Sequence, residues 1–163
     1  MKNTKLYLAY GSNLSLDQMD HRCPDARIVG TAEIKDYRLS YKGSGTGNYA
    51  TIEPAEGYYV PVLVWEISER DERNLDRYEG YNEHGYCFYT KEYMTVDVTD
   101  YMNETVESKE AMVYIMDTKR GYGLPSIYYE NVLRIGYNHF EFDRAILDEA
   151  RQYTIQQMNR KKA

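Results

Sequence analysis

The chain has 163 residues, with 26 acidic against 20 basic side chains and a formal net charge of −6. This length fits a single domain spanning residues 1–163, and the acidic balance argues against a nucleic-acid partner, which would need a basic face. Apolar runs stay well short of the ~20 residues of a membrane span, and the one near the N-terminus is too short for a signal-peptide core. We therefore expect a cytoplasmic protein with no membrane partner.

Tyrosine is the unusual component, with 19 copies against three phenylalanines and one tryptophan. Because an aromatic side chain buries roughly 150–250 Å², these rings can replace missing aliphatic side chains in the core and line clefts. The two cysteines, Cys23 and Cys87, are too few for a disulfide framework or a four-ligand zinc site, and the three histidines are scattered. We expect reduced, structural thiols and no metal site.

The first half of the chain is predicted to be mostly strands, with one short helix. Ser15, with Gln18 three residues later, forms a plausible capping box for that helix, which Pro24 ends. A strand follows the glycine-rich segment 43–48, whereas a phosphate-binding loop leads into a helix, so we expect a mobile hairpin loop there. The predicted strands of this half are residues 6–10, 27–41, 49–53 and 58–67.

The second half begins with a polar helix over residues 68–78, which Gly80 ends. Strands dominate the middle of the chain and helices flank it, so the predicted fold class is α+β, and five or six mostly long strands indicate a strongly curved sheet or barrel. The remaining predicted elements are strands at 86–98 and 111–116 and helices near 126–137 and 141–158.

Residues 7–14 are predicted to join a strand to a helix through Gly11-Ser12-Asn13. Gly11 permits unusual backbone dihedrals and close approach by a ligand. A helix start leaves unpaired N–H groups that can cradle a carboxylate, a phosphate or an oxyanion, and Ser12 and Asn13 add side-chain donors. The alternative is an ordinary strand–turn–helix in which Asn13 or Ser15 caps the helix.

Glu79 stands in the last turn of a predicted helix, between two tyrosines. The helix dipole disfavours a carboxylate there by roughly 0.3–1 kcal/mol. The dipole and burial against the rings both raise the pKa of the carboxyl group, which suits a general base working near neutral pH. The alternative is a solvated glutamate at a frayed helix end.

Several motifs together resemble the γ-glutamylcyclotransferase family, also described as AIG2-like. Tyr10-Gly11-Ser12-Asn13-Leu14 is followed in the chain by Leu75-Asp76-x-x-Glu79-Gly80. The matches run in the family's order from about residue 6 to about residue 130. The further matches are Ala50-Thr51-Ile52, Gly85-Tyr86 and Gly123-Leu124-Pro125-x-x-Tyr128.

The resemblance implies a small mixed β-barrel of five to seven strands with flanking helices. It also implies an intramolecular reaction, in which the α-amine of a γ-glutamyl group attacks its own γ-carbonyl and releases 5-oxoproline and an amino acid or amine, with no cofactor. Glu79 would be the catalytic general acid/base, acting on a small-molecule γ-glutamyl substrate in a monomer or homodimer. The implied substrate-binding residues are Tyr7, Tyr10, Gly11, Ser12, Asn13, Leu14, Tyr86 and Tyr128.

Two tyrosine placements are also predicted. Alternation along the first strand puts Tyr7 on the opposite face from Tyr10, so Tyr7 faces either the core or the pocket. Strand tyrosines such as Tyr114 are expected to stabilise the fold, whereas Tyr86 and Tyr128 are expected to close the pocket over the substrate.

Three alternatives stay open. Related enzymes that act on γ-glutamylamines usually carry Thr-Leu where this chain has Ser12-Asn13, which by resemblance favours γ-glutamyl amino acids over amines. The same fold could instead bind a γ-glutamyl compound or another small molecule without turnover. It could also carry a different acyl-transfer or hydrolytic enzyme, with Cys87 as the nucleophile and His84 as its nearest histidine in the sequence.

Overall fold

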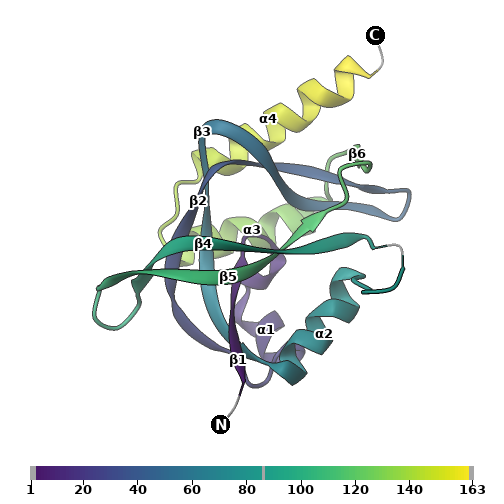
Figure 1. The fold of residues 1–163 in the computed structure, drawn as a ribbon. Coiled ribbons are helices and arrows are strands. Elements are labelled where there is room, and N and C mark those ends of the chain that lie inside the picture. Colours follow the sequence, from purple (N-terminus) through teal and green to yellow (C-terminus); the bar gives the residue numbers. More distant parts are fainter. Residues whose placement is uncertain (1–2, 86, 162–163) are drawn as a thin grey trace.

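The computed structural model describes residues 3–85 and 87–161, in which five strands close into a barrel, a sixth bonds to it, and four α-helices surround it (Figure 1). The strand order is β3-β1-β5-β4-β2-β6, and a further β2–β3 pairing closes the barrel. β1 runs parallel to β5, while the other pairs are antiparallel, so the predicted mixed barrel and α+β class are confirmed. The strands are β1 (Thr4–Ala9), β2 (Arg27–Ser44), β3 (Gly47–Ser68), β4 (Tyr89–Asp100), β5 (Val106–Met116) and β6 (Gly121–Tyr122).

The long β2–β3 hairpin differs from the prediction in two ways. The turn occupies only residues 45–46, and Ser44 already pairs with Gly47, so the expected loop is paired almost to its tip. β3 is also continuous where two strands were predicted. The cause is an irregularity inside the hairpin, where the N–H of Gly57 donates to Asp36 Oδ1 across 3.0 Å and the pairing shifts register without ending.

The β4–β5 hairpin forms a long two-stranded arm, whose far end at Thr99 and Asp100 pairs with β2 (Figure 1). β5 starts five residues before its predicted position, because residues 106–110 are polar or exposed and carry no core signal. The two-residue strand β6 was not predicted. The predicted start of β4 at residue 86 lies outside the described residues, and the strand is assigned from Tyr89.

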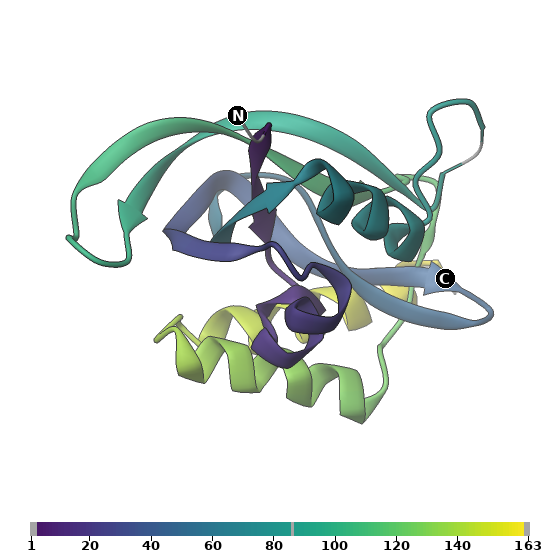
Figure 2. The same cartoon turned by 90° about the horizontal axis from the view of Figure 1, so that it is seen from below.

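Capping residues set the ends of the helices. The Ser15 hydroxyl accepts from the N–H of Gln18 at the start of α1, as predicted, but the Gln18 side chain bonds to Ser12 and Asn13 and does not complete the predicted capping box. Ser68 and Asp71 form a capping box at the start of α2, and Gly80 ends this helix with a left-handed backbone, φ 65°. Figure 2 shows α1 between α2 and α3. The helices are α1 (Leu16–Arg22), α2 (Glu69–Glu79), α3 (Ile127–His139) and α4 (Ala145–Arg160), with a short 3₁₀ helix η1 (Ser12–Leu14) after β1.

Tyrosine contributes to the core as the composition predicted. Tyr41 and Tyr137 are among the largest fully buried side chains. Leu14 packs beneath the turn against α3 at Gly136, where an added Cβ would lie 2.6 Å from the Leu14 Cβ. Among the described residues, no helix is long and apolar enough to cross a membrane.

Candidate active site

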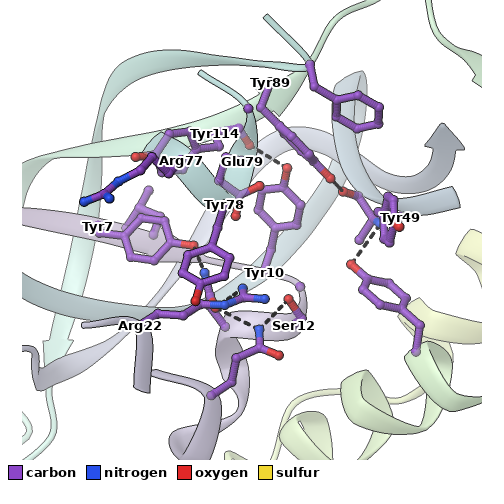
Figure 3. Close-up of a pocket in the computed structure, with 18 of the residues that line it drawn as sticks. Tyr7, Tyr10, Ser12, Arg22, Tyr49, Arg77, Tyr78, Glu79, Tyr89 and Tyr114 are labelled. Atoms are coloured by element: carbon purple, nitrogen blue, oxygen red, sulfur yellow. Dashed lines mark hydrogen bonds between the residues drawn. The ribbon is translucent and has the colours of Figure 1, made fainter. Parts of the chain in front are cut away.

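A cavity of about 470 Å³ lies where β1 leaves the sheet (Figure 3). Its lining comes from β1, η1, α1, β3, α2, β4, β5 and α3. It brings together the two motifs that the sequence singled out, the Gly11-Ser12-Asn13 turn and Glu79. These motifs are far apart in the chain, and closure of the barrel places them on one cavity.

The turn after β1 approaches its neighbours closely. A Cβ added to Gly11 would lie 3.1 Å from the Tyr129 hydroxyl oxygen, so a larger residue here would require the Tyr129 side chain to shift. The carbonyl oxygens of Gly11 and Ser12 accept backbone bonds from the residues three positions later. Among the described residues, no acceptor is found for the N–H groups of Ser12 and Asn13, which begin η1. Two donors are thus available for an anion.

Asn13 is buried, with 2% of its surface exposed, and its side chain connects three parts of the site. Its Oδ1 accepts from Gln18 Nε2 and from Arg22 Nη1, each across 3.0 Å. Its Nδ2 donates to the Tyr7 hydroxyl across 2.9 Å. The amide predicted to face a ligand is therefore largely used in holding α1 and Tyr7. The Ser12 hydroxyl oxygen accepts from Gln18 Nε2, which leaves its own proton free to donate.

Tyr7 and Tyr10 both face the cavity. Alternation predicted opposite faces, but β1 ends at Ala9 and Tyr10 already belongs to the turn, so the alternation does not extend to it. The Tyr10 hydroxyl donates to the backbone oxygen of Tyr114. Burial raises the pKa of both phenols above their usual range, so both hydroxyls are neutral at pH 7.

Glu79 is the last residue of α2, and its partly buried side chain lines the cavity. Among the residues that the structure describes, none donates a hydrogen bond to its carboxyl group. Burial raises the pKa of Glu79 to about 7, against a smaller lowering by the positive charge of Arg22. At neutral pH both protonation states of this group are therefore populated.

Two of the predicted binding residues are not brought to the cavity. Tyr128 points to solvent with 81% of its surface exposed, whereas the next residue of α3, Tyr129, lines the cavity. Consecutive residues of a helix point about 100° apart, so only one of the two can face inward. Leu14 is buried under the turn, outside the cavity lining. Tyr86 lies outside the described residues.

Several lining residues were missed from the sequence. Arg22 comes from the end of α1, Tyr49 from the β2–β3 hairpin, and Phe88 from the segment before β4. Tyr114, expected to be only structural, also lines the cavity, and its hydroxyl donates to Asp76 Oδ1 across 2.6 Å. Arg22 had one usable signal, a cation in the last turn of a helix that directly follows the Gly11-Ser12-Asn13 motif.

Neither cysteine lines this cavity. Cys87 Sγ contacts the backbone of Asn82 and Gly85 in its own loop, and neither it nor His84 lines the cavity. Cys23 is buried, and burial raises the pKa of its thiol to about 12. Over residues 3–85 and 87–161, no group of three or more His, Cys, Asp and Glu side chains is arranged to hold a metal ion.

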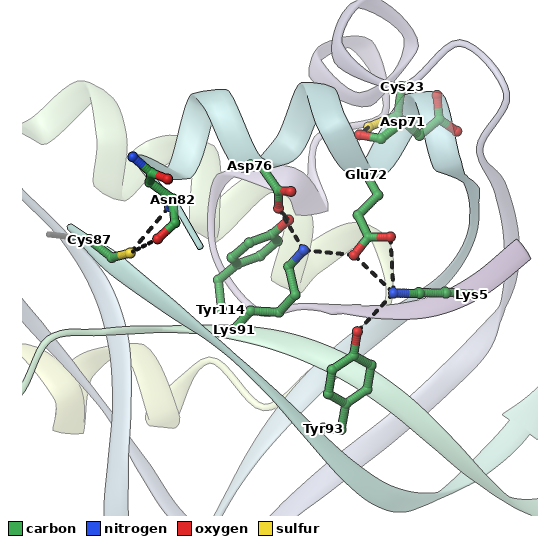
Figure 4. Close-up of polar contacts among 10 residues, drawn as sticks. All are labelled: Lys5, Cys23, Asp71, Glu72, Asp76, Asn82, Cys87, Lys91, Tyr93 and Tyr114. Carbon is green, nitrogen blue, oxygen red and sulfur yellow. Dashed lines mark hydrogen bonds and ion pairs between the residues drawn. The ribbon is translucent and has the colours of Figure 1, made fainter. Parts of the chain in front are cut away.

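An ionic cluster fastens α2, and hence Glu79, to the barrel (Figure 4). Lys91 of β4 pairs with Glu72 at 2.6 Å and with Asp76 at 2.8 Å. Lys5 of β1 also pairs with Glu72, and its ammonium group donates to the Tyr93 hydroxyl across 2.8 Å. The helix is thus tied to β1 and β4 through Asp76 and Glu72, which lie about one and two turns before Glu79.

Comparisons with known proteins find relatives of this chain. A family model described as gamma-glutamyl cyclotransferase, AIG2-like, matches residues 7–131, which include every residue of the cavity lining. A gamma-glutamylcyclotransferase from Bos taurus is 35% identical over 82 residues, which are 46% of this chain and 44% of the bovine protein. The match therefore spans less than half of the length of that relative.

Longer matches extend over most of the chain. A gamma-glutamylcyclotransferase from Mus musculus is 28% identical over 155 residues, covering 85% of this chain and 82% of the mouse protein. A solved structure described as gamma-glutamyl cyclotransferase superposes with a TM-score of 0.73 at 24% identity, covering 91% of this chain and 87% of its own. At that identity the superposition shows a shared fold.

Proposed function

The chain belongs to the gamma-glutamyl cyclotransferase, AIG2-like family, and we propose that it is an enzyme that cyclises γ-glutamyl compounds. In the proposed reaction the α-amine of the γ-glutamyl group attacks its own γ-carbonyl carbon. The new C–N bond closes a five-membered ring, the old amide C–N bond breaks, and 5-oxoproline leaves with a free amino acid or amine. The reaction as written consumes no water and needs no metal or cofactor.

Glu79 is the proposed acid and base. An α-amine with a pKa of roughly 8 is mostly protonated at pH 7, so a group must remove a proton before attack. The leaving nitrogen must then gain a proton, and one carboxyl group can do both in sequence. A pKa of about 7 supports this role, because such a carboxyl group both accepts and returns a proton near neutral pH.

The turn after β1 is proposed to hold the anionic part of the substrate. The N–H groups of Ser12 and Asn13 and the hydroxyl of Ser12 are candidate donors to the α-carboxylate or to the oxyanion that forms on the γ-carbonyl oxygen. Arg22, bonded to Asn13 Oδ1, adds a positive charge on the same side. Since both reacting groups belong to one molecule, holding it in a folded conformer supplies several kcal/mol of the barrier reduction.

The observation that carries the proposal is the common cavity of Glu79 and the Gly11-Ser12-Asn13 turn. The test measures 5-oxoproline release from a panel of γ-glutamyl amino acids. Glu79→Gln should lower kcat by about 10²–10⁴-fold, the range for loss of a general acid/base. Glu110→Gln, at an exposed glutamate on β5, is the matched control and should keep its activity. Full activity of Glu79→Gln would refute the mechanism, and tight ligand binding without product would indicate a binding protein.

A further inference from the structure

Three rings from separate elements form one face of the cavity, here called the aromatic wall: Tyr49, Phe88 and Tyr129. The Tyr49 ring centroid lies 5.5 Å from that of Tyr129 and 6.3 Å from that of Phe88, both in edge-to-face geometry. Tyr49 keeps 38% of its surface exposed. The wall therefore presents aromatic surface, partly exposed at Tyr49, to the cavity that Glu79 also lines.

The aromatic wall lies against both parts of the reaction centre. A Cβ added to Gly80, the residue after Glu79, would lie 3.1 Å from the Phe88 Cβ. A Cβ added to Gly11 would lie 3.1 Å from the Tyr129 hydroxyl oxygen. A ligand held between Glu79 and the turn is thus within reach of the wall.

The wall is also held in place by the backbone around it. The N–H of Phe88 donates to the carbonyl oxygen of Gly80, and the carbonyl oxygen of Phe88 accepts from the N–H of Asp117. The Tyr129 hydroxyl oxygen accepts from the N–H of Ala50 across 3.0 Å. Because these rings need little further ordering when a ligand arrives, their contact with it keeps most of its favourable free energy.

The opposite side of the cavity is cationic. The Arg22 guanidinium bonds to Asn13 and stacks on the Tyr78 ring, 4.2 Å from its centroid. Figure 3 shows Arg22 and Tyr49 on opposite sides of Tyr10 and Glu79. The α-carboxylate of a γ-glutamyl group belongs at the cationic side, so the released part of the substrate points toward the aromatic wall.

Charge at the wall selects against ionic side chains. In the lining as described, the charged residues are Arg22, Arg77 and Glu79, none of them part of the wall. The guanidinium carbon of Arg120 lies 4.2 Å from the Phe88 ring centroid, so this group already takes the place over that ring that a cationic side chain would occupy. An anionic side chain would lose hydration against the rings. An aliphatic or aromatic side chain meets neither obstacle and buries apolar surface.

We propose that the aromatic wall is the subsite for the released group, and that it selects γ-glutamyl amino acids whose released residue has an aliphatic or aromatic side chain. This inference rests on the proposed function, since it assumes that a γ-glutamyl group occupies the space between Glu79 and the turn. It narrows the substrate class from γ-glutamyl compounds in general to those with an apolar released residue.

The experiment compares kcat/KM for 5-oxoproline release from four dipeptides: γ-glutamyl-leucine, -phenylalanine, -alanine and -lysine joined through the lysine α-amine. Leucine and phenylalanine should exceed alanine by about tenfold or more, and lysine should be the poorest of the four. Tyr49→Ala should reduce the leucine-to-alanine ratio several-fold, while Tyr49→Phe should preserve it. Tyr101→Ala, at a tyrosine 59% exposed on the β4–β5 arm, is the matched control and should leave the ratio unchanged.

Equal kcat/KM for all four dipeptides, or a leucine-to-alanine ratio that survives Tyr49→Ala, would overturn the subsite while leaving the cyclisation in place. A second arm measures binding of the same dipeptides to Glu79→Gln by calorimetry. If wild-type protein releases no 5-oxoproline, the proposed function fails. The binding measurements then test by themselves whether the aromatic wall is a subsite. The subsite is supported if Glu79→Gln binds the leucine dipeptide more tightly than the alanine dipeptide and the Glu79→Gln, Tyr49→Ala double variant does not. Equal binding of the two dipeptides to Glu79→Gln rejects the subsite.

Discussion

Lys91 Nζ of β4 lies 2.8 Å from Oδ1 of Asp76, which precedes Glu79 by one turn of α2. The same ammonium group, whose side chain is 9% exposed, also pairs with Glu72 at 2.6 Å. A single cation therefore neutralises two carboxylates of α2 and joins this helix to β4. The place of the Glu79 carboxyl group at the cavity depends on that junction.

Replacing this cation should destabilise the protein. Lys91→Met leaves Glu72 and Asp76 close together with less compensating charge, and should lower the free energy of unfolding by about 2–3 kcal/mol. Lys109→Met is the matched control, since the Lys109–Glu107 pair is exposed, and should change it by less than about 0.5 kcal/mol. Urea unfolding of both variants measures the difference. Equal stability of the two would show that the cluster does not fasten α2.

Glu79 should make stability depend on pH. Burial raises its pKa to about 7 in the folded protein, against about 4.3 in the unfolded chain. The folded state therefore binds more protons over that range, and the free energy of unfolding falls as pH rises through it, by about 1.4 kcal/mol per pH unit at most. Glu79→Gln should match wild type near pH 4 and be more stable by about 3 kcal/mol at pH 8. A constant difference across this range would contradict the raised pKa.

Arg22 should influence both affinity and the pH profile. Its charge lowers the pKa of Glu79, so Arg22→Gln should move the acidic limb of kcat/KM to higher pH. Loss of a charged partner for the substrate carboxylate should also reduce kcat/KM by about tenfold. Arg73→Gln, at an exposed arginine of α2, provides the comparison and should leave the limb in place. An unshifted limb in Arg22→Gln would exclude Arg22 as a modulator of Glu79.

Adjacent tyrosines of α3 should respond differently to loss of the hydroxyl group. Tyr129→Phe removes the acceptor of the Ala50 N–H and should cost about 1 kcal/mol of stability, with a fall in kcat/KM. Tyr128→Phe, at a side chain 81% exposed, should change stability by less than about 0.5 kcal/mol and leave activity intact. Unfolding and 5-oxoproline assays of both variants would test this, and a larger effect at Tyr128 would restore that residue as the ligand contact.

Local signals in the sequence predicted helix ends and two motifs that line the candidate site. Ser15 and Gly80 were predicted correctly because a cap depends on residues within one turn. The raised pKa of Glu79 was predicted from the helix dipole and from burial against tyrosine rings, and burial is the cause found in the structure. The Gly11-Ser12-Asn13 turn was likewise found from its residues, and the structure adds that Asn13 is mainly engaged within the protein.

The remaining lining depends on closure of the barrel, which no local pattern encodes. The six residues 111–116 of β5 are all buried, so alternation gives no sign that Tyr114 faces a cavity. Tyr49 was assigned to a strand but not to the site, because its neighbours Phe88 and Tyr129 are distant in the sequence. Tyr128 was chosen over Tyr129 from a motif match, which does not say which face of the helix points into the cavity.

The central position of β1 has a kinetic consequence. β1 lies between β3 and β5, so the strand that leads into the turn gains its second neighbour only from residues 106–116. Contacts of such sequence separation are typical of domains that fold in milliseconds to seconds. The sole tryptophan, Trp65, stands opposite Tyr7 in the β1–β3 register and donates through Nε1 to the carbonyl oxygen of Asn13. Its fluorescence during refolding should therefore report when the barrel closes, and we expect recovery of 5-oxoproline release no earlier than that signal.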